Sequence, residues 1–233
     1  AGAGSGKTAV LTRRIAYLMR HRGVNPWEIL AITFTNKAAA EMKERVGGLV
    51  GPVAERMWVS TFHSICVRIL RQNAQLVPGL NTNFTIYDGD DARRLLSMIA
   101  KDMQLDLKKY TPRVLANQIS NHKNELIGPE SALEAAQQTK NPFEITVAQV
   151  YAEYQRRLRA ANAVDFDDLI GEVVRIFTQH QQVVDFYRRR FKHVLIDEYQ
   201  DTNHAQYALV AALVGRGELV PDAPELCVVG DSD

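Results

Sequence analysis

The chain has 233 residues, of which 46% are hydrophobic and 24% are charged, a composition that is typical of a folded globular protein and excludes a disordered one. No segment reaches the roughly 18 consecutive apolar residues that a membrane-spanning helix needs, and no signal-peptide pattern is present, so we expect a cytoplasmic protein without a membrane partner. Residues 1–80 carry 11 Lys and Arg against 4 Asp and Glu, whereas residues 162–233 carry 6 against 13. A basic segment suits a polyanionic partner and acidic groups suit a metal ion, although the two segments could instead neutralise each other within one domain.

The chain begins with a glycine-rich loop that reads Ala1, Gly2, Ala3, Gly4, Ser5, Gly6, Lys7, Thr8. Glycines allow a loop to turn its backbone N–H groups around a phosphate, Lys7 offers a positive charge to the β- and γ-phosphates, and the Thr8 hydroxyl can bind Mg²⁺. We therefore predict that these residues bind ATP and Mg²⁺. Alanine stands at position 1, where the strict pattern has glycine, and a glycine-rich linker is the alternative interpretation. The strand that normally precedes such a loop is not in the sequence, so we expect the chain to be a fragment.

A helix is predicted after this loop, beginning near Ala9, with its positive dipole end directed at the nucleotide. Its hydrophobic residues recur with helical spacing and share one face, which comprises Val10, Leu11, Ile15, Leu18 and Met19.

Four short apolar runs predict the strands of a parallel sheet that is covered by helices on both faces. They are Ile29–Ile32, Met57–Val59, His193–Ile196 and Leu226–Val229, and a polar or acidic residue follows each of them. Ligands of such sheets bind beyond the carboxyl ends of the strands, where these polar residues fall. Phe84–Tyr87 is a candidate for a fifth strand.

The middle of the chain shows helical patterns without a comparable strand, notably at Ala92–Met103, Pro112–Asn121 and Ala148–Ala161. We therefore expect an all-helical insertion at residues 89–161 within an α/β domain formed by residues 1–88 and 162–233. Such an insertion explains how Lys7 and Asp197, which are 190 residues apart in the chain, could still meet in one site.

An acidic pair, Asp197 and Glu198, follows the third apolar run. Asp197 can hold Mg²⁺, and Glu198 can accept a proton from the water that attacks the γ-phosphate, so with Lys7 and Thr8 they make a sufficient set for phosphoryl transfer. A pair of helix-capping residues is the alternative interpretation.

Six segments resemble, in the same order, motifs of superfamily 1A DNA helicases of the UvrD/Rep/PcrA type. They are Ala1–Thr8, Ile32–Met42, Val59–Ser64, Val164–Leu169, Val194–Asn203 and Val229–Asp233. The resemblance implies a RecA-like P-loop NTPase domain with an inserted helical domain, and the hydrolysis of ATP coupled to 3′→5′ movement on single-stranded DNA. It further implies partners, namely single-stranded DNA, its junctions with duplex, and a second RecA-like half of the same protein.

The resemblance also assigns roles to individual residues. Gln200 would sense the γ-phosphate, and the DNA path would be formed by Phe34, Thr35, Asn36 and Lys37, with Thr61, Phe62 and His63. Hydroxyl, amide and ammonium groups suit phosphate contacts and aromatic rings suit base stacking. In the alternative interpretation Thr35 caps the helix at residues 36–46 and both phenylalanines are core residues. Asp165 and Asp168 are expected to cap a helix.

Two further expectations concern activity. Since the arginines of the second half are not in the sequence, the chain alone should bind nucleotide weakly and hydrolyse little. A module that binds nucleic acid without turnover is the competing hypothesis.

Overall fold

The computed structural model describes residues 4–197, 203–215 and 223–229, and for Gly4, Ser5 and Lys7 it describes the backbone alone. The chain divides into two compact units. The first comprises Ala1–Cys66, Val174–Thr202 and Gln206–Asp233, and the second comprises Val67–Val173 with Asn203–Ala205.

A four-stranded parallel sheet forms the centre of the first unit, with the strand order β2-β1-β5-β6. The strands are β1 (Ile29–Thr33), β2 (Trp58–Thr61), β5 (His193–Asp197) and β6 (Glu225–Val229). Every residue of β1 is buried, because helices cover both faces of the sheet, and such a strand reads as a continuous apolar run. The α/β class and the four predicted strands of the sheet are therefore confirmed.

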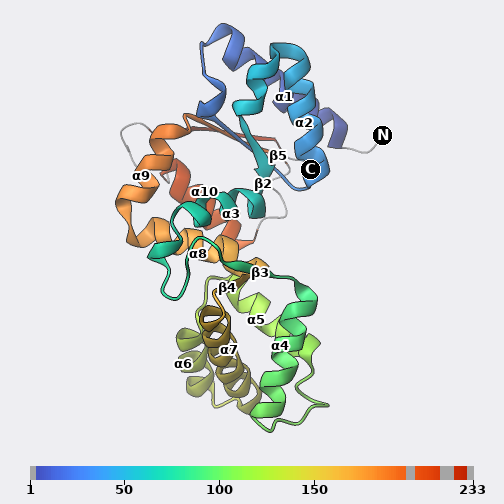
Figure 1. Cartoon of the computed structure of the whole chain (residues 1–233), viewed down its shortest axis with the longest axis vertical. Helices are drawn as coiled ribbons and strands as arrows, with labels where there is room; N and C mark the ends of the chain where they lie inside the picture. Colours follow the sequence, from blue (N-terminus) through green and yellow to red (C-terminus); the bar gives the residue numbers. More distant parts are fainter. Residues whose placement is uncertain (1–3, 198–202, 216–222, 230–233) are drawn as a thin grey trace. The chain divides into compact units, whose positions relative to one another are not determined.

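Helices α1 (Gly4–His21) and α2 (Asn36–Val50) cover one face of this sheet (Figure 1). Their buried residues form one apolar cluster with residues of the strands, namely Leu11, Ile15, Met42 and Val46 with Ile29, Ala31 and Leu195. Val10, which we expected on the same face as Leu11, is 52% exposed. Val10 lies at the edge of the apolar stripe of α1, where a side chain can reach solvent.

Further helices that belong wholly or partly to this unit are α3 (Phe62–Gln72), α8 (Phe166–Gln179), α9 (Gln181–Arg190) and α10 (His204–Val214). Trp58 of β2 packs edge-to-face on Phe191, which follows α9, with 5.0 Å between ring centroids. Arg188 of α9 donates two hydrogen bonds to the carbonyl oxygen of Ala212 in α10, at 2.9 and 2.7 Å. These contacts hold α9 against α10, and they hold the residue that follows α9 against β2.

The second unit contains four whole helices, parts of α3 and α8, and a two-stranded parallel sheet. The helices are α4 (Gly89–Asp102), α5 (Pro112–Asn124), α6 (Pro129–Thr139) and α7 (Pro142–Ala160), and the strands are β3 (Thr85–Tyr87) and β4 (Ala163–Asp165). Helix α8 (Phe166–Gln179) follows β4 directly. Residues 89–161 are helical or irregular throughout, so the all-helical character expected of this stretch is confirmed.

Two details of the second unit differ from expectation. Phe84–Tyr87 does contribute a strand, but β3 pairs with β4 and does not join the four-stranded sheet. Strand β4 was not predicted, because a strand of three residues is too short for its period to be recognised. Among the described residues, no helix combines the length and apolar composition required to cross a membrane.

Candidate nucleotide and nucleic-acid site

The direction of α1 places its first turn toward the carboxyl edge of the sheet. Arg14 Nη2 lies 3.0 Å from Oε1 of Glu225, the first residue of β6, so this part of α1 lies beside the amino end of that strand. The helix ends at His21 and a short connection leads to the start of β1 at Ile29. Helix α1 therefore runs antiparallel to the strands.

Thr8 and Asp197 come from segments far apart in the chain, one near the start of α1 and the other at the carboxyl end of β5. Thr8 is in the second turn of α1 and is 6% exposed, and Thr12 Oγ1 donates a 2.7 Å hydrogen bond to its carbonyl oxygen. Asp197 is the last residue of β5 and is 4% exposed. A hydroxyl and a carboxylate are oxygen ligands of the kind that Mg²⁺ prefers.

The start of α1 is also favourable for an anion. Its first turn carries no acidic side chain, so no carboxylate opposes the positive end of the helix dipole. The helix begins at Gly4, before the expected start near Ala9, and so contains part of the glycine-rich segment. A side chain at Gly6 would meet no other atom within 4 Å, which leaves open space beside the backbone here.

Several predicted residues lie outside the described residues: Ala1, Gly2, Ala3, Glu198 and Gln200. Only the backbone is described for Gly4, Ser5 and Lys7. The roles assigned to all these residues stay predictions.

The candidate nucleic-acid residues follow β1 and β2, whose last residues, Thr33 and Thr61, are paired in the sheet. Thr35 is the N-cap of α2, since its hydroxyl accepts a 3.0 Å hydrogen bond from the Ala38 N–H. The Thr33 hydroxyl in turn donates to the Thr35 carbonyl oxygen at 3.0 Å. These bonds fix the turn that presents the exposed side chains of Asn36 and Lys37.

Phe34 and Phe62 form an edge-to-face pair with 6.2 Å between ring centroids. Phe34 is half-buried and has surface to offer a base, whereas Phe62 is only 3% exposed. In this conformation Phe62 is a core residue that supports Phe34, because its own ring has almost no accessible face.

Thr61 and His63 lie beside this pair at the start of α3. The Thr61 hydroxyl accepts a 3.2 Å hydrogen bond from the Ser64 N–H and donates a 3.1 Å bond to the Ser64 hydroxyl. Burial lowers the pKa of His63, so this imidazole is neutral at pH 7. It can offer a hydrogen bond there but no positive charge.

The segment that contains Asp165 and Asp168 holds a buried ion cluster in the second unit. The Asp168 N–H donates to Asp165 Oδ1 at 2.9 Å and the Asp165 N–H donates to Asp168 Oδ2 at 3.1 Å, so the predicted helix cap is confirmed. Lys123 lies 2.7 Å from Asp165 and 3.0 Å from Asp168, and Arg159 lies 3.3 Å from Asp168. Lys123 was not among the predicted residues, although Leu115, Ile119 and Lys123 follow at helical spacing and a lysine on an apolar stripe signals a buried charge.

The whole chain is similar to known proteins. Residues 1–233 match the UvrD/REP helicase N-terminal domain. The chain is 66% identical over 235 residues to the ATP-dependent DNA helicase UvrD1 of Mycobacterium tuberculosis, covering all of this chain and 30% of that protein. It is 50% identical over 233 residues to the ATP-dependent DNA helicase PcrA of Bacillus subtilis, again covering all of this chain and 30% of the relative.

The chain thus spans about 30% of the length of the curated relatives it matches. The match over every residue agrees with the ordered motifs and with the parallel sheet of the first unit. The chain therefore belongs to the UvrD/REP helicase family and corresponds to the N-terminal domain of that family.

Proposed function

We propose that this chain is the ATP-binding part of a DNA helicase that couples ATP hydrolysis to 3′→5′ movement on single-stranded DNA and to the unwinding of duplex. The observation that supports the proposal is that the start of α1, which contains Thr8, and the end of β5, which is Asp197, both lie toward the carboxyl edge of the sheet. The relatives named as ATP-dependent DNA helicases support the same reaction.

In this proposal Lys7 binds the β- and γ-phosphates of ATP, and Thr8 and Asp197 hold Mg²⁺. The ion would neutralise charge on the phosphates. Glu198 orients and deprotonates the attacking water, and Gln200 senses the γ-phosphate. Each of these groups positions or neutralises charge, which is most of what phosphoryl transfer requires of a protein.

The DNA path follows the ends of β1 and β2. Phe34 would stack on a base, and the exposed Asn36 and Lys37 would contact phosphates. The same edge would include Thr35, Thr61 and His63, and the buried Phe62 would support the Phe34 ring. Residues 1–88 and 162–233 would form the ATP-binding domain and residues 89–161 the helical domain, with a second RecA-like half completing the ATP site. The chain alone would therefore hydrolyse little ATP.

Lys7→Ala in the full-length protein tests the proposal. The variant should lose most DNA-stimulated ATP hydrolysis and all unwinding, because the phosphates lose their cation, yet it should bind a single-stranded oligonucleotide in the absence of nucleotide. Lys101→Ala, which removes an exposed lysine of α4, serves as the matched control and should leave hydrolysis unchanged.

The competing function, a module that binds nucleic acid without turnover, predicts a different result. In that case the full-length protein would show no DNA-stimulated hydrolysis, and Lys7→Ala would change neither hydrolysis nor binding.

A further inference from the structure

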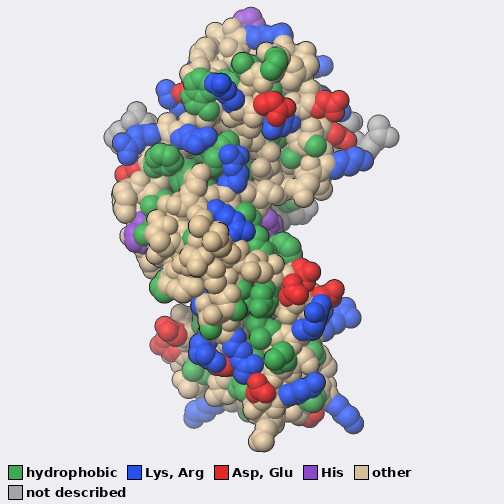
Figure 2. All heavy atoms as spheres, in the orientation of Figure 1, with side chains coloured by type: hydrophobic (Ala, Val, Ile, Leu, Met, Phe, Trp, Pro, Cys, Tyr) green, Lys and Arg blue, Asp and Glu red, His purple; other side chains and the backbone are tan. Residues whose placement is uncertain are grey.

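An open pocket of about 580 Å³ lies in the first unit, lined by Trp27, Phe186, Arg189 and Arg190. Trp27 lies just before the start of β1, and the other three belong to the second half of α9, the helix that precedes β5. The pocket is therefore at the amino edge of the sheet. Figure 2 shows basic and hydrophobic side chains gathered over the region where Figure 1 places α9.

Two large aromatic rings are unusually accessible here. Trp27 is 42% exposed and Phe186 is 54% exposed. Phe186 stands edge-on to the buried ring of Tyr187, with 5.1 Å between centroids, so its position is defined by packing. Neighbouring exposed aromatic side chains mark surfaces that another molecule covers.

Three arginines lie at or beside the pocket, since Arg189 and Arg190 line it and Arg56 lies against the Trp27 ring. The Arg56 guanidinium lies 5.9 Å from the centre of the Trp27 ring, and Arg190 lies 4.7 Å from the centre of the Trp58 ring. Arg189 donates a 3.3 Å hydrogen bond to the carbonyl oxygen of Asp185. Within the part of the chain that the structure describes, none of these three guanidinium groups is in an ion pair with a carboxylate, whereas the neighbouring Arg188 lies 3.8 Å from the Asp185 carboxylate.

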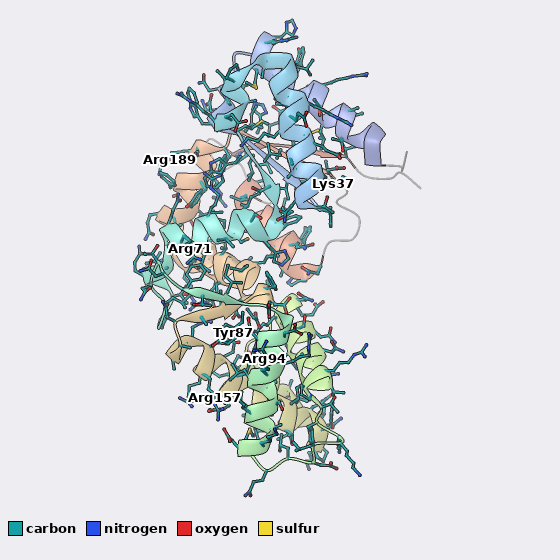
Figure 3. All side chains as sticks on the ribbon, turned by 45° about the vertical axis from the view of Figure 1, so that its right-hand side comes forward. Lys37, Arg71, Tyr87, Arg94, Arg157 and Arg189 are labelled. Atoms are coloured by element: carbon teal, nitrogen blue, oxygen red, sulfur yellow. The ribbon has the colours of Figure 1, made fainter. Side chains whose placement is uncertain are left out.

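The pocket is separate from the candidate nucleotide and nucleic-acid site. Lys37 follows β1 at the carboxyl edge of the sheet, whereas Trp27 precedes β1 at the amino edge. Figure 3 shows Lys37 and Arg189 on opposite sides of the first unit. A molecule bound in the pocket would therefore leave the carboxyl edge accessible.

We propose that this pocket binds an acidic segment of a partner protein, in which an aromatic or aliphatic side chain inserts between Trp27 and Phe186 and flanking carboxylates pair with Arg56, Arg189 and Arg190. Guanidinium groups bind carboxylates through two parallel hydrogen bonds, and tryptophan and arginine are enriched among the residues that dominate protein interfaces. A single-stranded nucleic acid instead needs a groove that follows its backbone over several nucleotides, and this pocket is suited to a few side chains.

Fluorescence anisotropy with the full-length protein tests the proposal. The probe is a short fluorescein-labelled peptide that alternates aspartate or glutamate with phenylalanine or leucine, and the reference probe has lysine at each acidic position. We expect the acidic peptide to bind with micromolar affinity and the basic peptide not to bind. Phe186→Ala and Arg189→Glu should each weaken binding about tenfold or more, while Arg45→Glu, at an exposed arginine of α2, should not change it.

ATP hydrolysis by each variant is measured in parallel and should equal that of the unsubstituted protein, since the pocket lies away from the candidate nucleotide site. Arg189 is exposed, so its variant remains informative if Phe186→Ala reduces folding. The proposal is overturned if the acidic peptide does not bind, or if it binds both variants as tightly as the unsubstituted protein. It is also overturned if Phe186→Ala and Arg189→Glu weaken the binding of a thymidine oligonucleotide and leave the binding of the acidic peptide unchanged.

Discussion

Lys123 Nζ lies 2.7 Å from Asp165 Oδ2, and only 4% of the lysine side chain is exposed. Asp165 also accepts a 2.9 Å hydrogen bond from the Tyr154 hydroxyl, and the second aspartate, Asp168, accepts a 3.1 Å bond from the Gln155 amide. Burial would lower the pKa of Lys123, but Asp168 and Asp165 outweigh it and raise the pKa. The two aspartates therefore keep Lys123 charged although it is surrounded by the core of the second unit.

Lys123→Met should destabilise the chain by about 3–5 kcal/mol, because it leaves two carboxylates buried without their common cation. Urea unfolding followed by circular dichroism measures the change. Arg156→Met provides the control, since Arg156 pairs with Glu153 on the exposed surface of α7 and its loss should shift the midpoint far less.

Asp165→Asn in the Lys123→Met background should recover part of the lost stability, because it removes a buried carboxylate that has lost its cation, whereas Asp168 keeps Arg159 at 3.3 Å. A double variant that is less stable than Lys123→Met alone would show that the lysine acts through packing and not through charge.

The cluster also predicts a dependence on acid. Burial would raise the pKa of Asp168, but the Lys123 ammonium and the Arg159 guanidinium outweigh it and hold the pKa at about 2. Because this pKa is lower in the folded than in the unfolded chain, ionised Asp168 stabilises the fold above about pH 4, and the contribution of about 2 kcal/mol is lost as the pH falls toward 2. Burial and the Asp168 charge raise the pKa of Asp165, which opposes part of this loss.

Unfolding midpoints measured from pH 6 to pH 2 test this assignment. Asp168→Asn should be less stable at pH 6 and should lose less stability on acidification than the unsubstituted chain. Equal losses in the two proteins would exclude Asp168 as the source.

Thr35→Ala should cost about 1 kcal/mol of stability, because the Ala38 N–H at the start of α2 loses its acceptor. Thr35→Ser keeps the hydroxyl and should keep the stability, as measured by urea unfolding. If Thr35 also contacts DNA, the alanine variant of the full-length protein will bind a single-stranded oligonucleotide more weakly than the serine variant does.

The two phenylalanines at the carboxyl edge should respond differently to substitution. Phe62→Ala should cost about 3–5 kcal/mol of stability, because it leaves a cavity in the core. Phe34→Ala should cost less stability and should weaken single-stranded DNA binding by about 1–3 kcal/mol through lost stacking. A Phe34 variant with unchanged DNA affinity would remove the ring from the proposed DNA path.

The elements that the sequence predicts well are those whose burial is nearly uniform. Ile29–Thr33 is buried at every position, so its apolar run alone indicates a central strand. Asp165 and Asp168 were predicted as a cap because the two reciprocal hydrogen bonds depend on residues only three apart.

The features that the sequence did not reveal depend on contacts between distant segments. The partner of β3 is β4, 78 residues further along for Thr85 and Ala163, and neither strand carries a pattern that specifies the other. The buried Lys123 is 42 residues from Asp165, and sequence alone does not show which carboxylates meet it. Phe62 reads equally well as a stacking surface or as core, since the exposure of a ring is decided by tertiary packing.

The pairing of β3 with β4 has a consequence for how this chain can be rearranged. The two strands run parallel, with Thr85 opposite Ala163 and Tyr87 opposite Asp165, so the chain leaves β3 at one end of the ladder and enters β4 at the other. A two-residue hairpin cannot join parallel strands, because the connection has to travel back along the whole strand before it enters the next one. Helices α4 to α7 therefore form the crossover that this pairing requires, and any shorter replacement would still need a linker that spans the length of the ladder.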